Sequence, residues 1–467
     1  MKTAIVDFSE IRINRIWRLE AEFYSQKSLV GSNCITGEQA IAFVQYGTSE
    51  ELNEGGHGYP TLRLNEFEGL FIKKPEKYCE NISRETYESM RLKKDDVLIC
   101  RTNGNPKLVG KSALVPKDYD YAFASYLFRV RPKKNFINSA TLTIYLNSRI
   151  GRSQIEKYLM VNNQANFSPA KFREIQIPQL ADFLQETIER IVYIAYRKQE
   201  SANLYYRDAE QALLSELDLL NWKPKHKLSF VKKLSDTDTA GRIDSEYFQP
   251  MYEEIIETMK KYKSGFVKLS EVARTMRGSL ISDVFYSENA GIPYIRGADI
   301  SSGFLGEDKL VYINNSFKPS NETKVEKGDI IFTMIGSVGA TALVDERYDK
   351  AFISNNLGKV STKNYNSKVL QILLHSIIGK MYFKRVQTQT AQPKISDKDI
   401  HEFILPLLRN EIITKIERLY IGVQNSRALS KYLLDITKRG VEIAIEKNEK
   451  DAQKWIDDEI KKLGNKL

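Results

Sequence analysis

The chain has few of the residues that carry most enzyme chemistry. Its 467 residues include only three cysteines and four histidines, and none of them forms a cluster in the sequence. Cys34, Cys79 and Cys100 are odd in number and far apart, which argues against a disulfide framework and against a structural zinc site. We therefore expect reduced thiols and no metal centre.

The sequence also lacks a long apolar run. No window approaches the ~18 apolar residues that a membrane-spanning helix needs. Asp7 and Glu10 would interrupt the apolar core of a signal peptide. With 42% hydrophobic and 28% charged residues, the composition is typical of a globular protein. We expect a soluble, cytoplasmic protein with no membrane partner and roughly three folding units.

Charge gives a weaker indication of the partner. Lysine and arginine number 70 against 60 aspartate and glutamate, so the formal net charge is +10. This excess favours a polyanionic partner such as nucleic acid, although it is spread over a long chain.

The most informative feature is an internal repeat. Five segments of the first half recur in the same order in the second half, with mostly conservative replacements, as expected of one fold copied twice. Short β-type runs and short helices alternate with Gly, Pro and Asn turns in each copy, which favours an α+β or α/β globule. The matched pairs are 18–24 with 242–248, 58–63 with 291–296, 94–99 with 327–332, 122–125 with 351–354, and 164–178 with 392–406.

A long amphipathic helix is predicted after each copy. Apolar residues recur there at three-and-four spacing over about 40 residues, which is the pattern of a coiled-coil-like seam. Gly440 is expected to weaken the second helix by roughly 1 kcal/mol relative to alanine. The predicted seam and partner-docking residues are Ile188, Ile191, Ala195, Ala202, Tyr205, Ile416, Leu419, Val423, Leu429, Leu433 and Ile436.

The order of these parts predicts the architecture. We expect two tandem α+β globules separated by long antiparallel helices, with a pseudo-twofold relation between the copies. Two independent domains with unrelated helical tails are the alternative. The predicted boundaries are 1–178 for the first globule, 179–222 for the central helix, 223–406 for the second globule and 407–467 for the C-terminal helix.

No motif in the sequence indicates catalysis. The segment 104–112 resembles a phosphate-binding loop, but it has five residues between its glycines instead of four, and a β-type run follows instead of a helix. The paired acidic residues of 18–24 and 242–248 are flanked by arginine and have no lysine partner, so we expect a structural role for them. No nucleophile elbow or dinucleotide fingerprint is present. We predict no catalytic and no metal-binding residue.

The doubled arrangement resembles the specificity subunit of type I restriction–modification systems. The resemblance is carried by RIDSEYF at 242–248, KGDII at 327–331, the glycine turn at 336–339, QPKIS at 392–396 and the Leu405-Pro406 entry into the last helix. The first copy departs from this pattern because Asp95 stands where Gly328 stands in the second copy.

This resemblance implies a function for the parts. Each globule would be a target-recognition domain that reads one half of a split sequence in double-stranded DNA. The helices would act as a ruler and as a docking surface for methyltransferase (modification) subunits in an enzyme that also holds restriction subunits. The chain itself would be non-catalytic. S-adenosylmethionine would bind the modification subunits, and ATP and Mg²⁺ would serve the restriction subunits.

Polar and basic residues on turns that differ between the copies are the candidates for DNA contact. Arg, Asn, Gln and Lys can pair with guanine and adenine edges. Arg63 and Arg296 are repeated, which favours a structural or phosphate-binding role for them. In the first globule the candidates are Arg63, Arg101, Asn103, Asn105, Lys107, Lys111, Asn163 and Asn166. In the second globule they are Arg277, Arg296, Ser337, Asn355, Asn356, Gln389 and Lys394.

Two other functions remain open at this point. The chain could be a stand-alone nuclease or methyltransferase with its own recognition domains, although no stretch outside the repeats is long enough for a catalytic domain. It could also be a scaffold whose helical rod binds protein partners without DNA. Salt-insensitive or absent DNA binding would favour the scaffold.

Overall fold

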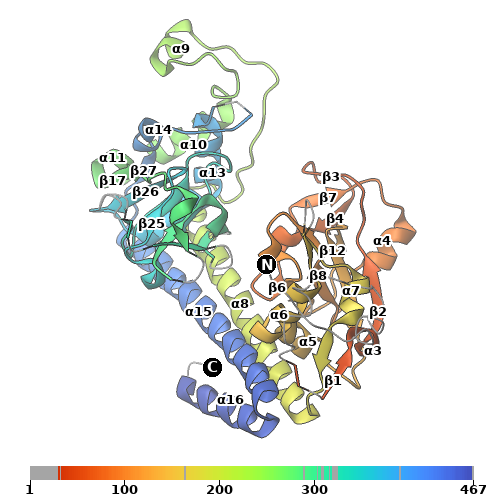
Figure 1. Cartoon of the computed structure of the whole chain (residues 1–467). Helices are drawn as coiled ribbons and strands as arrows, with labels where there is room; N and C mark the ends of the chain where they lie inside the picture. The colour runs from red at the N-terminus through yellow and green to blue at the C-terminus, as the bar shows by residue number, and fades with distance from the viewer. Residues whose placement is uncertain are drawn as a thin grey trace. The chain divides into compact units, whose positions relative to one another are not determined.

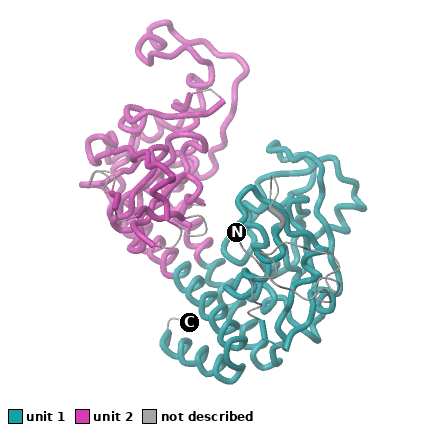
Figure 2. Tube along the Cα trace, in the orientation of Figure 1, with its two compact units in different colours: residues 1–201, 426–467 teal, residues 202–425 magenta. Residues whose placement is uncertain are grey.

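The chain divides into two compact units. The computed structural model describes residues 30–31, 33–161, 165–287, 290–301, 303–306, 310–314, 316–317, 324–388 and 391–464. Unit 1 comprises residues 1–201 and 426–467, and unit 2 comprises residues 202–425 (Figure 2). Each unit contains one globule together with part of each long helix, α8 (Asp182–Glu216) and α15 (Asn410–Glu446) (Figure 1).

Two four-stranded sheets form the globule of unit 1. The first has the order β10-β8-β12-β2 and is antiparallel throughout. The second has the order β11-β4-β7-β3, in which only β11 and β4 run parallel. The strands are β2 (Ile41–Tyr46), β3 (Leu52–Asn53), β4 (Tyr59–Leu62), β7 (Lys77–Cys79), β8 (Val97–Cys100), β10 (Ser112–Leu114), β11 (Ala122–Phe123) and β12 (Leu127–Pro132).

Unit 2 repeats these two sheets in the same order. Its first sheet, β24-β23-β26-β17, is antiparallel, and its second, β25-β19-β22-β18, has a single parallel pair, β19 with β25. The fold is therefore duplicated, as the sequence repeat predicts. The strands are β17 (Ala273–Arg277), β18 (Tyr286–Ser287), β19 (Ile292–Ile295), β22 (Val311–Ile313), β23 (Ile330–Thr333), β24 (Thr341–Leu343), β25 (Phe352–Ile353) and β26 (Leu357–Thr362).

A short clasp closes each globule where the chain enters and leaves it. In unit 1 the entering strand β1 (Cys34–Thr36) pairs antiparallel with the leaving strand β15 (Gln176–Pro178). In unit 2 β16 (Phe266–Lys268) pairs in the same way with β27 (Ile404–Pro406). The small ladders that complete the copies are β5 (Phe67–Glu68) with β6 (Phe71–Ile72), β20 (Ile300–Ser301) with β21 (Phe304–Leu305), and β9 (Thr102–Asn103) with β14 (Ala165–Asn166) and β13 (Met160–Val161).

A pair of helices joined by a tight turn is also repeated. A serine caps the second helix of each pair, Ser148 in unit 1 and Ser376 in unit 2. A Cβ at Gly151 would lie 1.9 Å from the carbonyl oxygen of Tyr145, and one at Gly379 would lie 2.0 Å from that of Leu374, so only glycine permits this close turn. The helix pairs are α5 (Ser139–Asn147) with α6 (Arg149–Tyr158) and α12 (Ser367–His375) with α13 (Ile377–Val386).

Shorter helices complete the described part of the chain. They are α3 (Gly37–Ala40), α4 (Arg84–Met90), α7 (Pro169–Glu174), α9 (Leu234–Ala240), α10 (Pro250–Lys260), α11 (Leu269–Val272), α14 (Asp397–His401) and α16 (Glu449–Leu463). Single 3-10 turns are η1 (Leu64–Glu66), η2 (Pro106–Leu108), η3 (Asp283–Phe285), η4 (Gly297–Asp299) and η6 (Glu346–Tyr348).

In each copy a buried aspartate that precedes one strand of the first sheet pairs with a buried basic residue on the neighbouring strand. In unit 1 an oxygen of the buried Asp96 carboxylate lies 3.0 Å from the guanidinium of Arg129, which is itself buried. In unit 2 Asp329 and Lys359 occupy the equivalent positions at 3.3 Å. Burial lowers the pKa of Arg129, and the neighbouring Asp96 charge opposes that shift.

The residue before each buried aspartate has left-handed backbone geometry. Asp95 has φ of 70° and Gly328 has φ of 95°. Aspartate is one of the few non-glycine residues that tolerate this region. The Asp95 carboxylate also accepts a hydrogen bond of 3.0 Å from the hydroxyl of Tyr193 on α8. The departure of the first copy from the Gly-Asp pattern therefore preserves the shape of the turn.

The long helices pack antiparallel within each unit. In unit 1 the hydroxyl of Ser430 donates to the carbonyl oxygen of Ala195 at 2.8 Å, and the carboxylate of Glu449 accepts from the backbone N–H of Ala181 at 2.7 Å. In unit 2 Arg409 at the start of α15 forms two bonds, of 2.9 and 2.5 Å, to the carboxylate of Glu216 at the end of α8.

The predicted seam is mostly buried. Ten of the eleven seam residues are buried or half-buried. Tyr205 is 39% exposed, and its ring lies over Gly422. The helices are slightly shorter than the predicted 40 residues. The C-terminal one is divided, because Asn448 caps a separate helix, α16.

Within the part of the chain that the structure describes, no helix combines the length and the apolar character needed to cross a bilayer.

Candidate nucleic-acid interface

One edge of the first sheet carries the long turns in both copies. Because neighbouring strands of this sheet are antiparallel, the ends of β2 and β8 lie beside the starts of β10 and β12. We call this edge, with the turns that leave it and the segment that precedes α7, the turn edge. In unit 2 the turn edge consists of the ends of β17 and β23, the starts of β24 and β26, and the segment that precedes α14.

The turn edge of unit 1 gathers most of the predicted DNA-contact residues of the first globule. The backbone N–H of Arg101 donates to the carbonyl oxygen of Tyr126 at 2.7 Å, and the N–H of Phe167 donates to the carbonyl oxygen of Arg101 at 2.8 Å. The Arg101 guanidinium lies 5.4 Å from the centre of the exposed Tyr46 ring. The predicted residues on this edge are Arg101, Asn103, Asn105, Lys107, Lys111 and Asn166.

The turn edge of unit 2 is built with the same hydrogen bonds. The N–H of Met334 donates to the carbonyl oxygen of Asn356 at 2.9 Å, and the N–H of Ile395 donates to the carbonyl oxygen of Met334 at 3.0 Å. The Arg277 guanidinium donates to the carbonyl oxygen of Asn355 at 2.7 Å. The predicted residues on this edge are Arg277, Ser337, Asn355, Asn356 and Lys394.

Arg63 and Arg296 lie at matching sites directly after β4 and β19. The Arg63 guanidinium lies 2.7 Å from the fully buried carboxylate of Glu66, whose other oxygen accepts from the Arg63 backbone N–H at 2.6 Å. The backbone N–H of Arg296 donates to Asp299 in the same way, at 2.8 Å. These contacts agree with the structural role that their repetition suggests. Asn163 and Gln389 lie outside the described residues.

Sequence reasoning missed three exposed apolar or aromatic residues at or beside the turn edges. Tyr46 and Tyr126 are exposed in unit 1, and Leu280 is exposed just after β17 in unit 2. The pairing registers align Tyr46 with Arg277, because each faces the second residue of β12 or β26. A comparison of the two copies at turn positions would have found the tyrosines, since the second copy has a predicted contact residue at each aligned site.

The side chains on the turn edges match the chemistry of base recognition. Arginine, asparagine and lysine donate to base edges and phosphates, and exposed tyrosine offers a flat surface for packing against a base or sugar. Arg152 on α6 fixes the turn of unit 1 by donating to the carbonyl oxygens of Val109 and Lys107, at 2.8 and 3.1 Å. That turn runs directly into β10 and opens no helix, so it lacks the anion site of a phosphate-binding loop.

The repeated RIDSEYF segment fastens the end of α13. Arg242 donates to the carbonyl oxygens of Val386 and Gln387, at 2.7 and 3.1 Å, and is paired with Asp244. The ring of Tyr247 has the guanidinium of Arg242 and that of Arg385 each 4.6 Å from its centre. Asp244 therefore holds the arginine that binds the end of α13, which agrees with the structural role expected for the acidic residues of the segment. Its counterpart at 18–24 lies outside the described residues.

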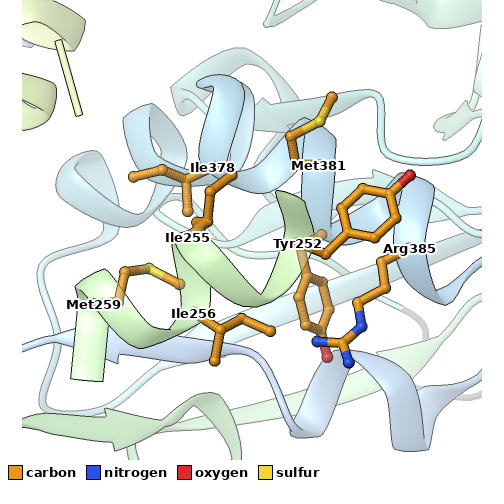
Figure 3. Close-up of a pocket in the computed structure, with 8 residues that line it drawn as sticks. Tyr252, Ile255, Ile256, Met259, Ile378, Met381 and Arg385 are labelled. Carbon is orange, nitrogen blue, oxygen red and sulfur yellow. The ribbon is translucent and has the colours of Figure 1, made fainter. Parts of the chain in front are cut away.

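The hollow between two helices of unit 2 is too small for a substrate or cofactor. The hollow between α10 and α13 has a volume of about 10 Å³ and is lined by residues that include Tyr252, Met381 and Arg385 (Figure 3). Such a hollow holds at most one water molecule. Burial raises the pKa of the Cys100 thiol to about 12, which makes it a poor nucleophile. No cluster of three metal-ligating side chains occurs within the described ranges.

Two sequence comparisons point to the same group of proteins. Residues 260–447 match the family described as the type I restriction modification DNA specificity domain. The type I restriction enzyme EcoKI specificity subunit of Escherichia coli strain K12 is 22% identical over 346 residues, covering 71% of this chain and 69% of that protein. The second half of the chain is therefore similar to the type I restriction–modification DNA specificity domain. The StySPI specificity subunit of Salmonella potsdam is 30% identical over 91 residues, 20% of this chain and 19% of that protein.

Solved specificity subunits cover most of the chain at low similarity. The HsdS subunit from Thermoanaerobacter tengcongensis is 14% identical with a TM-score of 0.30, covering 90% of this chain and 98% of that one. The S subunit from M. genitalium is 13% identical with a TM-score of 0.36, covering 91% and 98%. The likeness to specificity subunits therefore rests on the sequence matches.

Proposed function

We propose that the chain is the DNA-recognition subunit of a type I restriction–modification enzyme, and that each turn edge reads one half of a bipartite target in duplex DNA. The observation that carries the proposal is a shared backbone with different side chains. The same two hydrogen bonds hold Arg101 in unit 1 and Met334 in unit 2. Tyr126 in one copy corresponds to Asn356 in the other. A common frame with different exposed groups suits the reading of two different half-sites.

The charge of the chain supports a phosphate-contacting protein. A net charge of +10 favours binding to a polyanion, and such binding weakens steeply with salt because bound counterions are released. Arg63 and Arg296, which hold buried carboxylates, are expected to support the fold, while the turn-edge residues contact the DNA.

We further propose that α8 and α15 set the spacing of the half-sites and dock modification subunits, with a pseudo-twofold relation between the copies. The seam side chains hold the helices together, while a few apolar side chains face outward. Leu204 on α8 and Tyr432 on α15 occupy matching positions in the repeat and are 45% and 39% exposed. A pair of equivalent exposed positions suits two copies of a partner.

In this proposal the methylation and cleavage of DNA are carried out by the partner subunits. We propose that this chain is non-catalytic and acts in the cytoplasm, where it assembles with modification and restriction subunits. S-adenosylmethionine would then bind the modification subunits, and ATP and Mg²⁺ the restriction subunits. The turn edges of the described chain supply hydrogen-bond donors and flat side chains, which position DNA and perform no bond cleavage.

Selection from random duplexes tests the proposal. The full-length chain, assembled with its modification subunits, is expected to enrich a sequence with two fixed blocks separated by unread base pairs, with affinity that falls between 50 and roughly 200 mM salt. Arg101→Ala is expected to relax one block, and Asn356→Ala the other. Loss of a single bidentate contact costs about 1–3 kcal/mol of discrimination.

Three outcomes would count against it. If both substitutions relaxed the same block, the assignment of one half-site to each globule would fail. A single uninterrupted block would contradict the bipartite target. Binding that is absent or insensitive to salt would favour the scaffold function. Val338→Ala, a change at an apolar neighbour on the second turn edge, serves as the control that leaves both blocks in place.

A further inference from the structure

A segment of unit 2 presents apolar side chains to solvent. Residues 223–243, which we call the arm, follow α8 and include α9 (Figure 1). Leu228 is 100% exposed, Val231 is 95% exposed and Leu234 is 77% exposed. Aliphatic side chains exposed singly are common on proteins, but three in seven consecutive residues form a patch that water solvates poorly.

The arm is nevertheless fastened to the globule. The side-chain amide of Gln249, which is buried, accepts from the backbone N–H of Lys227 at 3.0 Å and donates to its carbonyl oxygen at 2.9 Å. The ammonium group of Lys232 lies 2.6 Å from both carboxylate oxygens of Glu253 on α10. These contacts lie on both sides of Leu228, so the backbone is held while the aliphatic side chains face outward.

The spacing of the exposed residues suits recognition as an extended peptide. Leu228 and Val231 lie three residues apart in a stretch without helix or strand, where an extended chain with three residues per turn places them on one side, and Leu234 follows three residues later as the first residue of α9. No strand or helix is formed between residues 223 and 233. Extended segments of this kind bind in apolar grooves, where the main chain is aligned and alternate pockets take the side chains.

The charged residues of the arm indicate which charge should line the edge of a groove that binds it. Lys223, Lys225 and Lys227 are exposed, and within the described ranges their ammonium groups form no ion pair. Duplex DNA would satisfy these lysines but would leave the exposed aliphatic side chains in water. A protein groove with an apolar floor and a rim of carboxylates satisfies both groups, so it fits the arm better.

We propose that the arm docks as an extended peptide in an apolar, acid-rimmed groove of the modification subunit. This inference rests on the proposed function, in which that subunit is the protein partner of the chain. An enzyme that modifies a base in the half-site of the second globule must lie close to that globule, and the arm is fastened to it.

Amide hydrogen exchange of the full-length chain tests the docking. The chain is compared alone, with purified modification subunit, with restriction subunit, and with a 30-base-pair duplex. Amides of residues 226–235 are expected to exchange at least tenfold more slowly with the modification subunit and to be unaffected by the other additions. Protection by the duplex alone, by the restriction subunit alone, or at high concentration of the chain alone would overturn the proposal. Unchanged exchange in every mixture would overturn it as well.

Substitutions separate the docking from folding and from DNA binding. A Leu228→Ser, Val231→Ser, Leu234→Ser triple variant removes exposed groups only, so its melting temperature is expected to match that of the unchanged chain. Its affinity for the modification subunit is expected to fall at least tenfold. Val284→Ser, which alters another highly exposed aliphatic residue, is the matched control and leaves that affinity intact. Unchanged affinity of the triple variant would overturn the docking even where selection from random duplexes supports DNA recognition.

Discussion

At position 328 the backbone has φ of 95°, a geometry that favours glycine, and the first copy meets the same requirement with Asp95. Gly328→Val places a β-branched side chain in this region and is expected to destabilise the protein by about 2 kcal/mol. Gly328→Asp is expected to cost less than half of that, because aspartate tolerates the region. Urea unfolding measures both. Equal costs would contradict a conformational origin, since the nearest atom to an added Cβ, Ser367 Oγ, lies 4.0 Å away and causes no clash.

The buried pairs predict unequal effects for the two aspartates. Asp96→Asn leaves the buried guanidinium of Arg129 without its counterion and is expected to destabilise the protein by about 3 kcal/mol. Asp329→Asn is expected to cost less, because Lys359 and Asp329 are slightly more exposed than Arg129 and Asp96. Thermal unfolding of each variant gives the comparison. A larger loss for Asp329→Asn would contradict this ranking.

Residue-level reasoning from sequence succeeded where periodicity or repetition supplied the signal. The apolar spacing identified the buried seam, and the repetition of Arg63 and Arg296 indicated a role shared by both copies. It failed at Tyr46 and Tyr126, because exposure on a turn has no periodic pattern. Whether the turn-edge residues contact DNA stays a prediction.

The joint between the long helices in unit 2 predicts a dependence on pH. Hydrogen bonds from Arg409 and Tyr262 lower the pKa of Glu216 from 4.5 to about 2. A lowered carboxyl pKa contributes stability above pH 4.5 that is lost as the pH falls towards 2. Glu216→Gln is therefore expected to lower the melting temperature at pH 7, with a loss of about 1 kcal/mol, and to have little effect near pH 2. An effect that persisted at pH 2 would contradict the ionic origin.

A glycine near the end of α15 makes room for α16. A Cβ at Gly440 would lie 2.5 Å from a side-chain carbon of Ile456. Gly440→Leu is expected to displace α16 and to speed amide exchange in residues 449–463. Gly440→Ala gains about 1 kcal/mol of helix propensity, which offsets the small shift of Ile456. Slow exchange in the leucine variant would show that α16 packs independently of this contact.

The second helix was predicted as one element, and the structure divides it. Asn448 separates α15 from α16. Its side chain accepts a hydrogen bond from the backbone N–H of Asp451 and so caps the start of α16. The composition on both sides of Asn448 remains helical, so the periodic pattern shows no interruption. The cap itself, asparagine followed three residues later by aspartate, was the available signal.

At the scale of the whole chain, the proposed ruler predicts how target spacing responds to helix length. Inserting seven residues into α8 and seven into the facing part of α15 lengthens each helix by roughly 10 Å. The unread spacer is expected to grow by about three base pairs, while both recognised blocks stay unchanged. Selection from random duplexes measures both. A changed block with an unchanged spacer would contradict the ruler.

The clasps β1–β15 and β16–β27 carry an implication for inheritance. Each brings the two ends of one globule together as neighbouring strands. A genetic crossover at both ends of such a segment would therefore transplant all the sheets of one globule, which must then pack against the same long helices, and would leave the sheets of the other globule undisturbed. Under the proposed function, lineages that exchange these segments would acquire new DNA targets one half at a time, provided that the long helices stay unchanged.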